Sequence, residues 1–124
     1  MTEIDEQRLY ANIVGHVPSE ISDRIKVGME ADPKLTKMFE DIRLHVMESD
    51  VLDAKTVQMI LFAMMAAKLI GPPTEYHAVA AKMAGASKEE LYAVAGLTLL
   101  AGGMRSYNTA GAAIAAAFDI SSDD

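Results

Sequence analysis

The chain has 124 residues, of which 51% are hydrophobic, and a formal net charge of −7. This length suits one ordinary domain with a modest core, so we expect a single domain over residues 1–124. The acidic balance disfavours nucleic acid and anionic membrane surfaces as partners, because both require a basic protein surface.

The sequence contains no cysteine, which excludes disulfides, thiolate nucleophiles and cysteine-ligated metals. No basic stretch followed by an apolar run marks a signal peptide, and the longest apolar stretch, residues 59–67, is far shorter than the ~20 residues that span a bilayer. We therefore expect a cytoplasmic protein. The three histidines lack the i, i+4 spacing of a helical metal site, so no metal is expected.

Helix signals recur along the chain, and no stretch shows the sustained alternation of a β-strand. Seven stretches have helical apolar spacing between capping or breaking residues. In chain order they cover about residues 3–15, 18–29, 33–48, 54–71, 72–85, 88–101 and 104–118. The fourth is apolar on nearly every side from Met59 to Leu69, which predicts a central, buried helix.

Particular residues mark the helix ends. Asp32 and Asp53 are N-cap candidates, and Ser87 with Glu90 has the spacing of a capping box. A Gly-Gly pair at residues 102–103 separates the last two helices. The pattern predicts an all-α domain of about six or seven helices. The last two carry alanine and glycine on several faces, so we expect a second copy of the chain to cover part of that surface.

Two segments, "LDAKTVQMILFAMMAAKLIG" and "EYHAVAAKMAGASKEELYAVAGLTLLAGG", resemble the carboxymuconolactone decarboxylase family, which includes the alkylhydroperoxidase-D-like proteins. The resemblance is strongest over residues 52–118. It implies an all-α fold and a homo-oligomer, often a trimer or hexamer. It also implies one of two chemistries: thiol peroxidase activity through a C-x-x-C pair, or cofactor-free decarboxylation of a lactone carboxylic acid from aromatic breakdown, with a histidine as acid–base group.

Several reactive groups of the family are replaced in this sequence. His77 occupies the family histidine position, whereas Ile70 and Pro73 stand where the two cysteines would be. The peroxidases of the family also have a glutamate on the preceding helix, and Gln58 stands at its position. A tyrosine common in the decarboxylases is replaced by Ala101. Without a thiolate there is no nucleophile to attack a peroxide, so the peroxidase reading fails, while the decarboxylase reading needs no thiol.

His77 is the first candidate catalytic residue. It shares a helix face with three alanines at positions 80, 81 and 84, which leave room for a ligand or for a closely packed helix. Histidine titrates near neutral pH and can shuttle a proton, although a hydrogen-bonded helix histidine without a role fits the same pattern. The opposite stripe, Tyr76, Val79 and Met83, is expected in the core.

Gln58 is the second catalytic candidate, because an amide in an apolar stripe needs a partner. It could hydrogen-bond His77 or a substrate oxygen, or be a structural amide. Arg105 and Tyr107 are candidate substrate-binding residues, since a guanidinium fits a carboxylate and the family's substrates are acids. The alternative for Arg105 is an exposed salt bridge.

These residues lead to an enzyme hypothesis: His77 and Gln58 would act on a small organic acid held by Arg105 and Tyr107. The competing hypothesis is a non-catalytic binding or assembly subunit of the same family, which the missing cysteines and Gln58 favour. A third possibility, an acidic helical protein that binds a partner protein, agrees less well with the many helix caps and breaks, which predict a compact domain.

Overall fold

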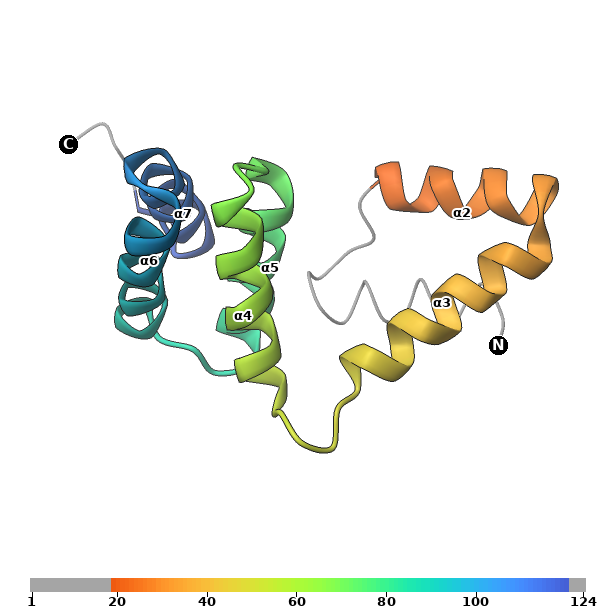
Figure 1. Ribbon diagram of the computed structural model, residues 1–124, viewed down its shortest axis with the longest axis horizontal. Helices are drawn as coiled ribbons and strands as arrows, with labels where there is room; N and C mark the ends of the chain where they lie inside the picture. Colours follow the sequence, from red (N-terminus) through yellow and green to blue (C-terminus); the bar gives the residue numbers. More distant parts are fainter. Residues whose placement is uncertain (1–18, 121–124) are drawn as a thin grey trace. The chain divides into compact units, whose positions relative to one another are not determined.

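The computed structural model describes residues 19–120, and every regular element in that range is an α-helix (Figure 1). The helices in chain order are α2 Ser19–Ala31, α3 Pro33–Met47, α4 Ala54–Ala67, α5 Gly71–Met83, α6 Lys88–Gly102 and α7 Met104–Ala117. The predicted all-α class is confirmed. The helix predicted over residues 3–15 lies outside the described residues. None of the described helices is long and apolar enough to cross a bilayer.

The chain divides into two compact units, residues 1–51 and 52–124. In the first unit α2 packs against α3. In the second unit α4 contacts α5, α6 and α7, and α7 also packs against α5 and α6. The expectation of a single domain over residues 1–124 stays a prediction.

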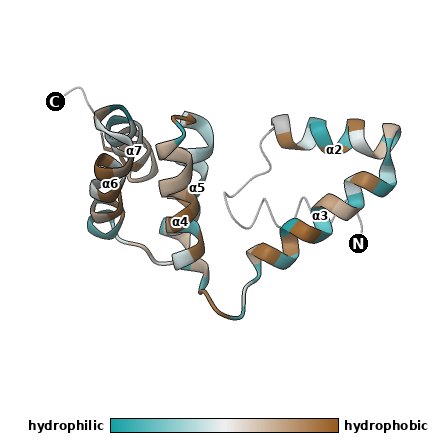
Figure 2. Cartoon of the chain, in the orientation of Figure 1, coloured by the Kyte–Doolittle hydropathy of each residue, from teal (hydrophilic) through white to brown (hydrophobic). Residues whose placement is uncertain are grey.

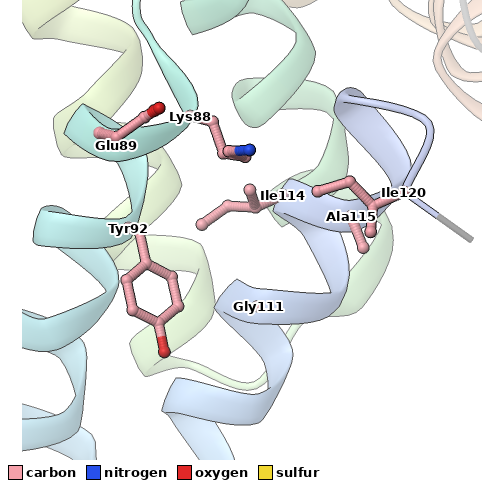
Figure 3. Close-up of a pocket in the computed structure, with 7 residues that line it drawn as sticks. All are labelled: Lys88, Glu89, Tyr92, Gly111, Ile114, Ala115 and Ile120. Carbon is pink, nitrogen blue, oxygen red and sulfur yellow. The ribbon is translucent and has the colours of Figure 1, made fainter. Parts of the chain in front are cut away.

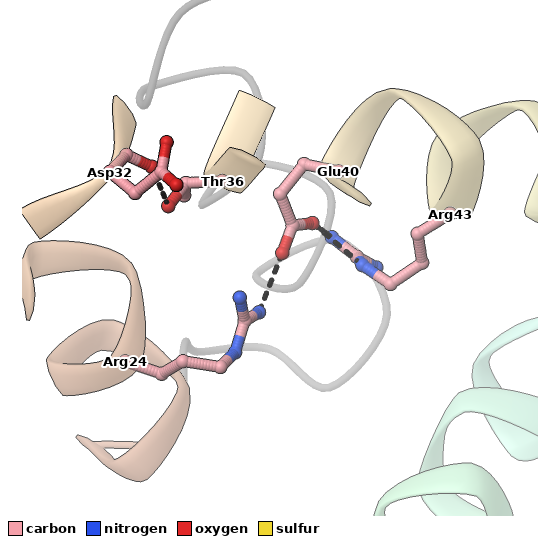
Figure 4. Close-up of polar contacts among 5 residues, drawn as sticks. All are labelled: Arg24, Asp32, Thr36, Glu40 and Arg43. Atoms are coloured by element: carbon pink, nitrogen blue, oxygen red, sulfur yellow. Dashed lines mark hydrogen bonds and ion pairs between the residues drawn. The ribbon is translucent and has the colours of Figure 1, made fainter. Parts of the chain in front are cut away.

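A buried carboxylate joins the two helices of the first unit. Glu40 of α3 is fully buried. Arg24 of α2 donates from Nη2 to its Oε1 at 2.6 Å, and Arg43 donates from Nε to its Oε2 at 2.7 Å. Figure 4 shows the carboxylate between the two guanidinium groups. A buried charge is tolerated here because both of its oxygens accept charge-assisted hydrogen bonds.

The first unit leaves an apolar stripe of α3 exposed. The side chains of this stripe follow helical spacing, and each is more than half exposed: Leu35, Met38, Phe39, Ile42 and Val46. They alternate with polar residues along the ribbon in Figure 2. The opposite face of the helix, with Thr36 and Glu40, is the buried one. The ion pairs of Glu40 therefore join α3 to α2, and most of the apolar stripe is exposed in this unit.

The second unit has a core of alanines around a few large side chains. Phe62, Leu91 and Ile114 are the large members. The small members are Ala66, Ala78, Ala81, Ala86, Ala95, Ala110, Ala113 and Ala117. Helices can approach closely where the side chains between them are small.

Helix α4, which is brown along most of its length in Figure 2, contacts the three other helices of its unit. The predicted central position of α4 agrees with these contacts within the second unit, but the helix is not fully buried, because Ile60 and Met64 are 44% and 51% exposed. Three helices contact α4, but they do not enclose it, and these two side chains lie on the face they leave open.

Side-chain hydrogen bonds cap the starts of α3, α4 and α6 as predicted. The side chains of Asp32 and Asp53 accept from the backbone N–H groups three residues later, at 3.0 and 2.7 Å. Ser87 and Glu90 form the full capping box, with both bonds at 3.0 Å. Glu90 also accepts from Lys55 Nζ of α4 at 3.0 Å. The backbone and Lys55 hydrogen bonds hold the pKa of the Glu90 carboxyl below its ordinary value.

Helix α4 ends at Ala67, four residues before the predicted end at Gly71. Leu69 adopts a left-handed backbone with φ of 62°. The N–H of Ile70 donates to the Met65 carbonyl at 3.1 Å, which closes the six-to-one bond of a helix C-terminal motif. The chain then reverses into α5, so the turn is built on a leucine and not on the nearby glycine.

Removing the Ser87 hydroxyl is expected to lower the free energy of unfolding by about 1 kcal/mol, because the Glu90 N–H at the start of α6 loses its acceptor. Urea unfolding of Ser87→Ala, followed by circular dichroism, measures the change. Ser87→Asp keeps an acceptor and is expected to recover most of the loss. Equal stability of the alanine variant and the wild type would show that the box contributes nothing.

Candidate functional site

The two candidate catalytic residues meet between α4 and α5. Gln58 lies in the second turn of α4, and His77 lies in the middle of α5. The short turn over residues 68–70 sets the two helices antiparallel and side by side (Figure 1). The His77 Nδ1 and Gln58 Oε1 atoms are 2.8 Å apart, which is a hydrogen bond. Of the two partners proposed for Gln58, the structure provides the imidazole.

The bond determines how the ring of His77 is protonated. An amide oxygen only accepts hydrogen bonds, so Nδ1 carries the proton and Nε2 keeps its lone pair. Burial disfavours the charged form and lowers the pKa of His77 from 6.5 to about 4. At neutral pH the ring is therefore an uncharged base that can take up a proton at Nε2.

The surroundings of the ring are partly as predicted. Ala80 and Ala81 on its helix are buried. Met83 is 57% exposed, so its predicted place in the core is wrong. Met83 lies in the last turn of α5, while Val79 packs against the core from a half-buried position.

Within one chain, Arg105 does not lie close to Gln58 and His77. It is exposed in the first turn of α7. The next residue, Ser106, donates from its hydroxyl to the carbonyl of Ala67 at 3.5 Å, which places the start of α7 beside the end of α4. Gln58 precedes Ala67 by nine residues, or about 13 Å along the helix axis. The carboxylate-binding candidate is therefore at the opposite end of α4.

Tyr107 has a partner that the sequence did not indicate. Its hydroxyl makes a short hydrogen bond with the hydroxyl of Tyr92 on α6, and the two ring centroids are 5.7 Å apart. This bond raises the pKa of Tyr107 above its ordinary value. The two residues belong to different helices with no common periodicity, so only the packing of α6 on α7 reveals the pair.

Two open pockets of about 550 Å³ each occur in the second unit, and neither is lined by His77 or Gln58. The first lies between α6 and α7, and its walls are mostly apolar (Figure 3). The second lies between the start of α5 and the middle of α7, with Glu75, Tyr76 and Thr109 as polar lining. Within residues 19–120 no three histidine, aspartate or glutamate side chains are grouped so that they could hold a metal ion.

Comparison with known proteins decides the family. The family model for the carboxymuconolactone decarboxylase family matches residues 33–117, which is most of the chain. The chain belongs to the carboxymuconolactone decarboxylase family. A crystal structure of a protein from Burkholderia xenovorans LB400, provisionally named a carboxymuconolactone decarboxylase, superposes with a TM-score of 0.77 at 21% sequence identity. That match covers 94% of this chain and 88% of the other. No curated protein sequence matches the chain.

Membership of the carboxymuconolactone decarboxylase family is consistent with the all-α fold. At 21% identity, the likeness to the Burkholderia protein shows the shared fold and does not by itself define a reaction. Among the candidate site residues, Gln58 and His77 form a direct hydrogen bond with each other.

Proposed function

We propose that this member of the carboxymuconolactone decarboxylase family catalyses cofactor-free proton transfer on a small organic acid. The leading reaction is decarboxylation of a lactone carboxylic acid from aromatic catabolism. The hydrogen bond between His77 and Gln58 carries the proposal, because it fixes the ring in the form that presents a lone pair at Nε2.

The proposed step balances without a metal or cofactor. The bond between the substrate carbon and its carboxylate breaks, CO2 leaves, and the electron pair remains on carbon in conjugation with the lactone. A proton then reaches that carbon. The uncharged His77 takes up a proton from solvent water at Nε2, and the buried imidazolium that results readily gives this proton to carbon, because its pKa of about 4 makes it a stronger acid than an ordinary imidazolium.

Within one chain, Arg105 lies too far from His77 and Gln58 to bind the carboxylate of a substrate held there. The group that binds this carboxylate would have to come from a second copy of the chain. We therefore extend the proposal to a homo-oligomer in which Arg105 and Tyr107 of a second copy complete the site. Exposed apolar side chains on α6 support association: Leu97 is 62% exposed and Leu100 is 85% exposed. A soluble cytoplasmic enzyme of aromatic catabolism would agree with this assembly.

A turnover assay tests the proposal. Metal-free protein is incubated with a panel of small lactone carboxylic acids in D2O, and the products are followed by proton NMR. We expect loss of CO2 from at least one acid, with deuterium at the carbon that carried the carboxylate. Consumption of none of these acids, or a reaction that starts only when a metal is added, would contradict cofactor-free catalysis.

The pH dependence provides a second prediction. Because the pKa of His77 is lowered to about 4, the base stays uncharged down to that pH. Because the imidazolium form of His77 gives the proton to carbon, we expect kcat/KM to rise by up to about tenfold per pH unit as the pH falls from 7 toward the pKa, and to level off below it. Titration of the ring by 15N NMR reports the same pKa and the Nδ1–H tautomer. A ring that titrates near 6.5 would contradict the burial that underlies the proposal.

The non-catalytic alternative rests on a specific observation. His77 and Gln58 line neither of the two described pockets, and the cysteines and glutamate of the family are replaced. A binding or assembly subunit would retain a folded oligomer without turning over any acid. In that case a small molecule retained by the purified protein, identified by mass spectrometry, would be recovered unchanged after incubation.

A further inference from the structure

The pocket between α6 and α7 has the features of a ligand site separate from the His77–Gln58 pair. Its volume of about 550 Å³ is in the range of small-molecule sites. Ile114, Ala115 and Ile120 form its apolar wall, and Tyr92 stands on the other side with its ring toward α7 (Figure 3). This lining suits the hydrocarbon part of a ligand and offers few hydrogen-bonding groups to a strongly polar ligand.

Gly111 forms part of the floor of this pocket and has no structural reason to be glycine. It lies in the middle of α7, where glycine destabilises a helix by roughly 0.5–1 kcal/mol relative to alanine. A Cβ atom built at this position would meet nothing within 4 Å. Packing inside the chain therefore does not require the glycine. The absence of a side chain at Gly111 leaves open space on the floor of the pocket.

The rim of the pocket carries one cation and one carboxylate. Figure 3 shows the Lys88 side chain extending toward Ile114, over the apolar floor, while Glu89 lies to the side on the first turn of α6. Among the described residues, Lys88 has no ion-pair partner. A ligand whose charged end is negative would pair with this ammonium group while its apolar body lies against Ile114.

We propose that this pocket binds an amphipathic monocarboxylate, a hydrocarbon chain or ring with a single carboxylate that pairs with Lys88. The site shares no residue with the His77–Gln58 pair and does not depend on the proposed reaction. The apolar wall provides most of the affinity, and Lys88 sets the orientation of the ligand.

Sodium octanoate is the probe, titrated into the full chain by isothermal calorimetry and by 15N-resolved NMR. We expect saturable binding, with shift changes around residues 88–92 and 111–120. Hexanoate, two methylenes shorter, is expected to bind about tenfold more weakly, since each buried methylene contributes about 0.8 kcal/mol. Octylamine, with the opposite charge, is expected to bind more weakly than octanoate. Failure of octanoate to bind, or tighter binding of octylamine, would overturn the proposal.

Matched glycine variants locate the site. Gly111→Leu fills the floor of the pocket and is expected to weaken octanoate binding by about tenfold or more, the equivalent of 1.4 kcal/mol. Gly96→Leu places the same side chain in the middle of α6, where a Cβ also meets nothing within 4 Å and no lining residue of this pocket is changed. Its affinity is expected to stay within about twofold of the wild type. Gly111→Ala, which favours the helix, confirms that the fold accepts a side chain there.

Two further measurements separate this ligand from other occupants. Lys88→Gln is expected to weaken octanoate binding by about two- to fivefold, because the ion pair is exposed, and to remove its salt dependence. If Gly111→Leu binds octanoate as the wild type does, the pocket is not the site. If the same variant changes the oligomeric mass by light scattering while the wild type binds no octanoate, a second copy of the chain fills the pocket and the proposal is wrong.

Discussion

Replacement of His77 by alanine is expected to lower kcat by about 10²–10⁴-fold, the usual contribution of a positioned acid–base group. The reason is chemical: alanine cannot take up or release a proton, and the Gln58 amide that remains is a poor base. The measurement is turnover of the lactone acid identified in the substrate panel, at pH 7, for wild type and variant.

The control for this variant is another histidine of the same chain. His45 is exposed near the end of α3, and His45→Ala is expected to keep full activity. Circular dichroism and light scattering should show that both variants keep the helix content and mass of the wild type. Full activity of a folded His77→Ala protein would rule out the proposed mechanism and leave the non-catalytic alternative.

Replacement of Glu40 by alanine is expected to destabilise the first unit by about 2 kcal/mol, because it removes a buried carboxylate that accepts charge-assisted hydrogen bonds from both helices. The carboxylate is fully buried and accepts from Arg24 and Arg43 at once. Its removal takes away these two hydrogen bonds and leaves space between α2 and α3. Urea unfolding, followed by circular dichroism, measures the loss.

A neighbouring carboxylate provides the matched control for Glu40. Asp41 is exposed on the next position of α3, and Asp41→Ala is expected to change stability by less than about 0.5 kcal/mol. Glu40→Gln keeps the shape but loses the charge, and its stability should lie between those of the alanine variant and the wild type. A Glu40→Ala protein as stable as Asp41→Ala would show that the two ion pairs do not hold the unit together.

Local signals allowed most helix ends to be predicted. Asp32, Asp53 and Ser87 cap the helices that their sequence positions indicated, because a cap depends on residues within one turn. The end of α4 was placed four residues too late, because a glycine at position 71 is a common stop signal and a leucine at position 69 is not. The actual stop depends on how the chain must reverse into α5, which no local pattern contains.

The candidate site could be predicted only in part for a similar reason. The chemistry of His77 and Gln58 can be read from residue types and from the family resemblance, and a bond between them was one of two options. The position of Arg105 follows from the packing of α7 against the end of α4, and the Tyr92–Tyr107 pair follows from the packing of α6 on α7. Periodicity describes one helix at a time, so contacts between helices cannot be obtained from it.

The left-handed leucine at position 69 has a consequence for the proton-transfer group. A non-glycine residue in this conformation carries local strain of about 1–2 kcal/mol, which the surrounding fold must outweigh. Leu69 lies in the turn between α4, which carries Gln58, and α5, which carries His77. The conformation of this turn therefore sets the axial register of the two helices. A slip of one residue would move the two side chains about 1.5 Å past each other along the axis. The alignment of Gln58 Oε1 with His77 Nδ1 therefore depends on the turn at Leu69, which is distant in sequence from both residues.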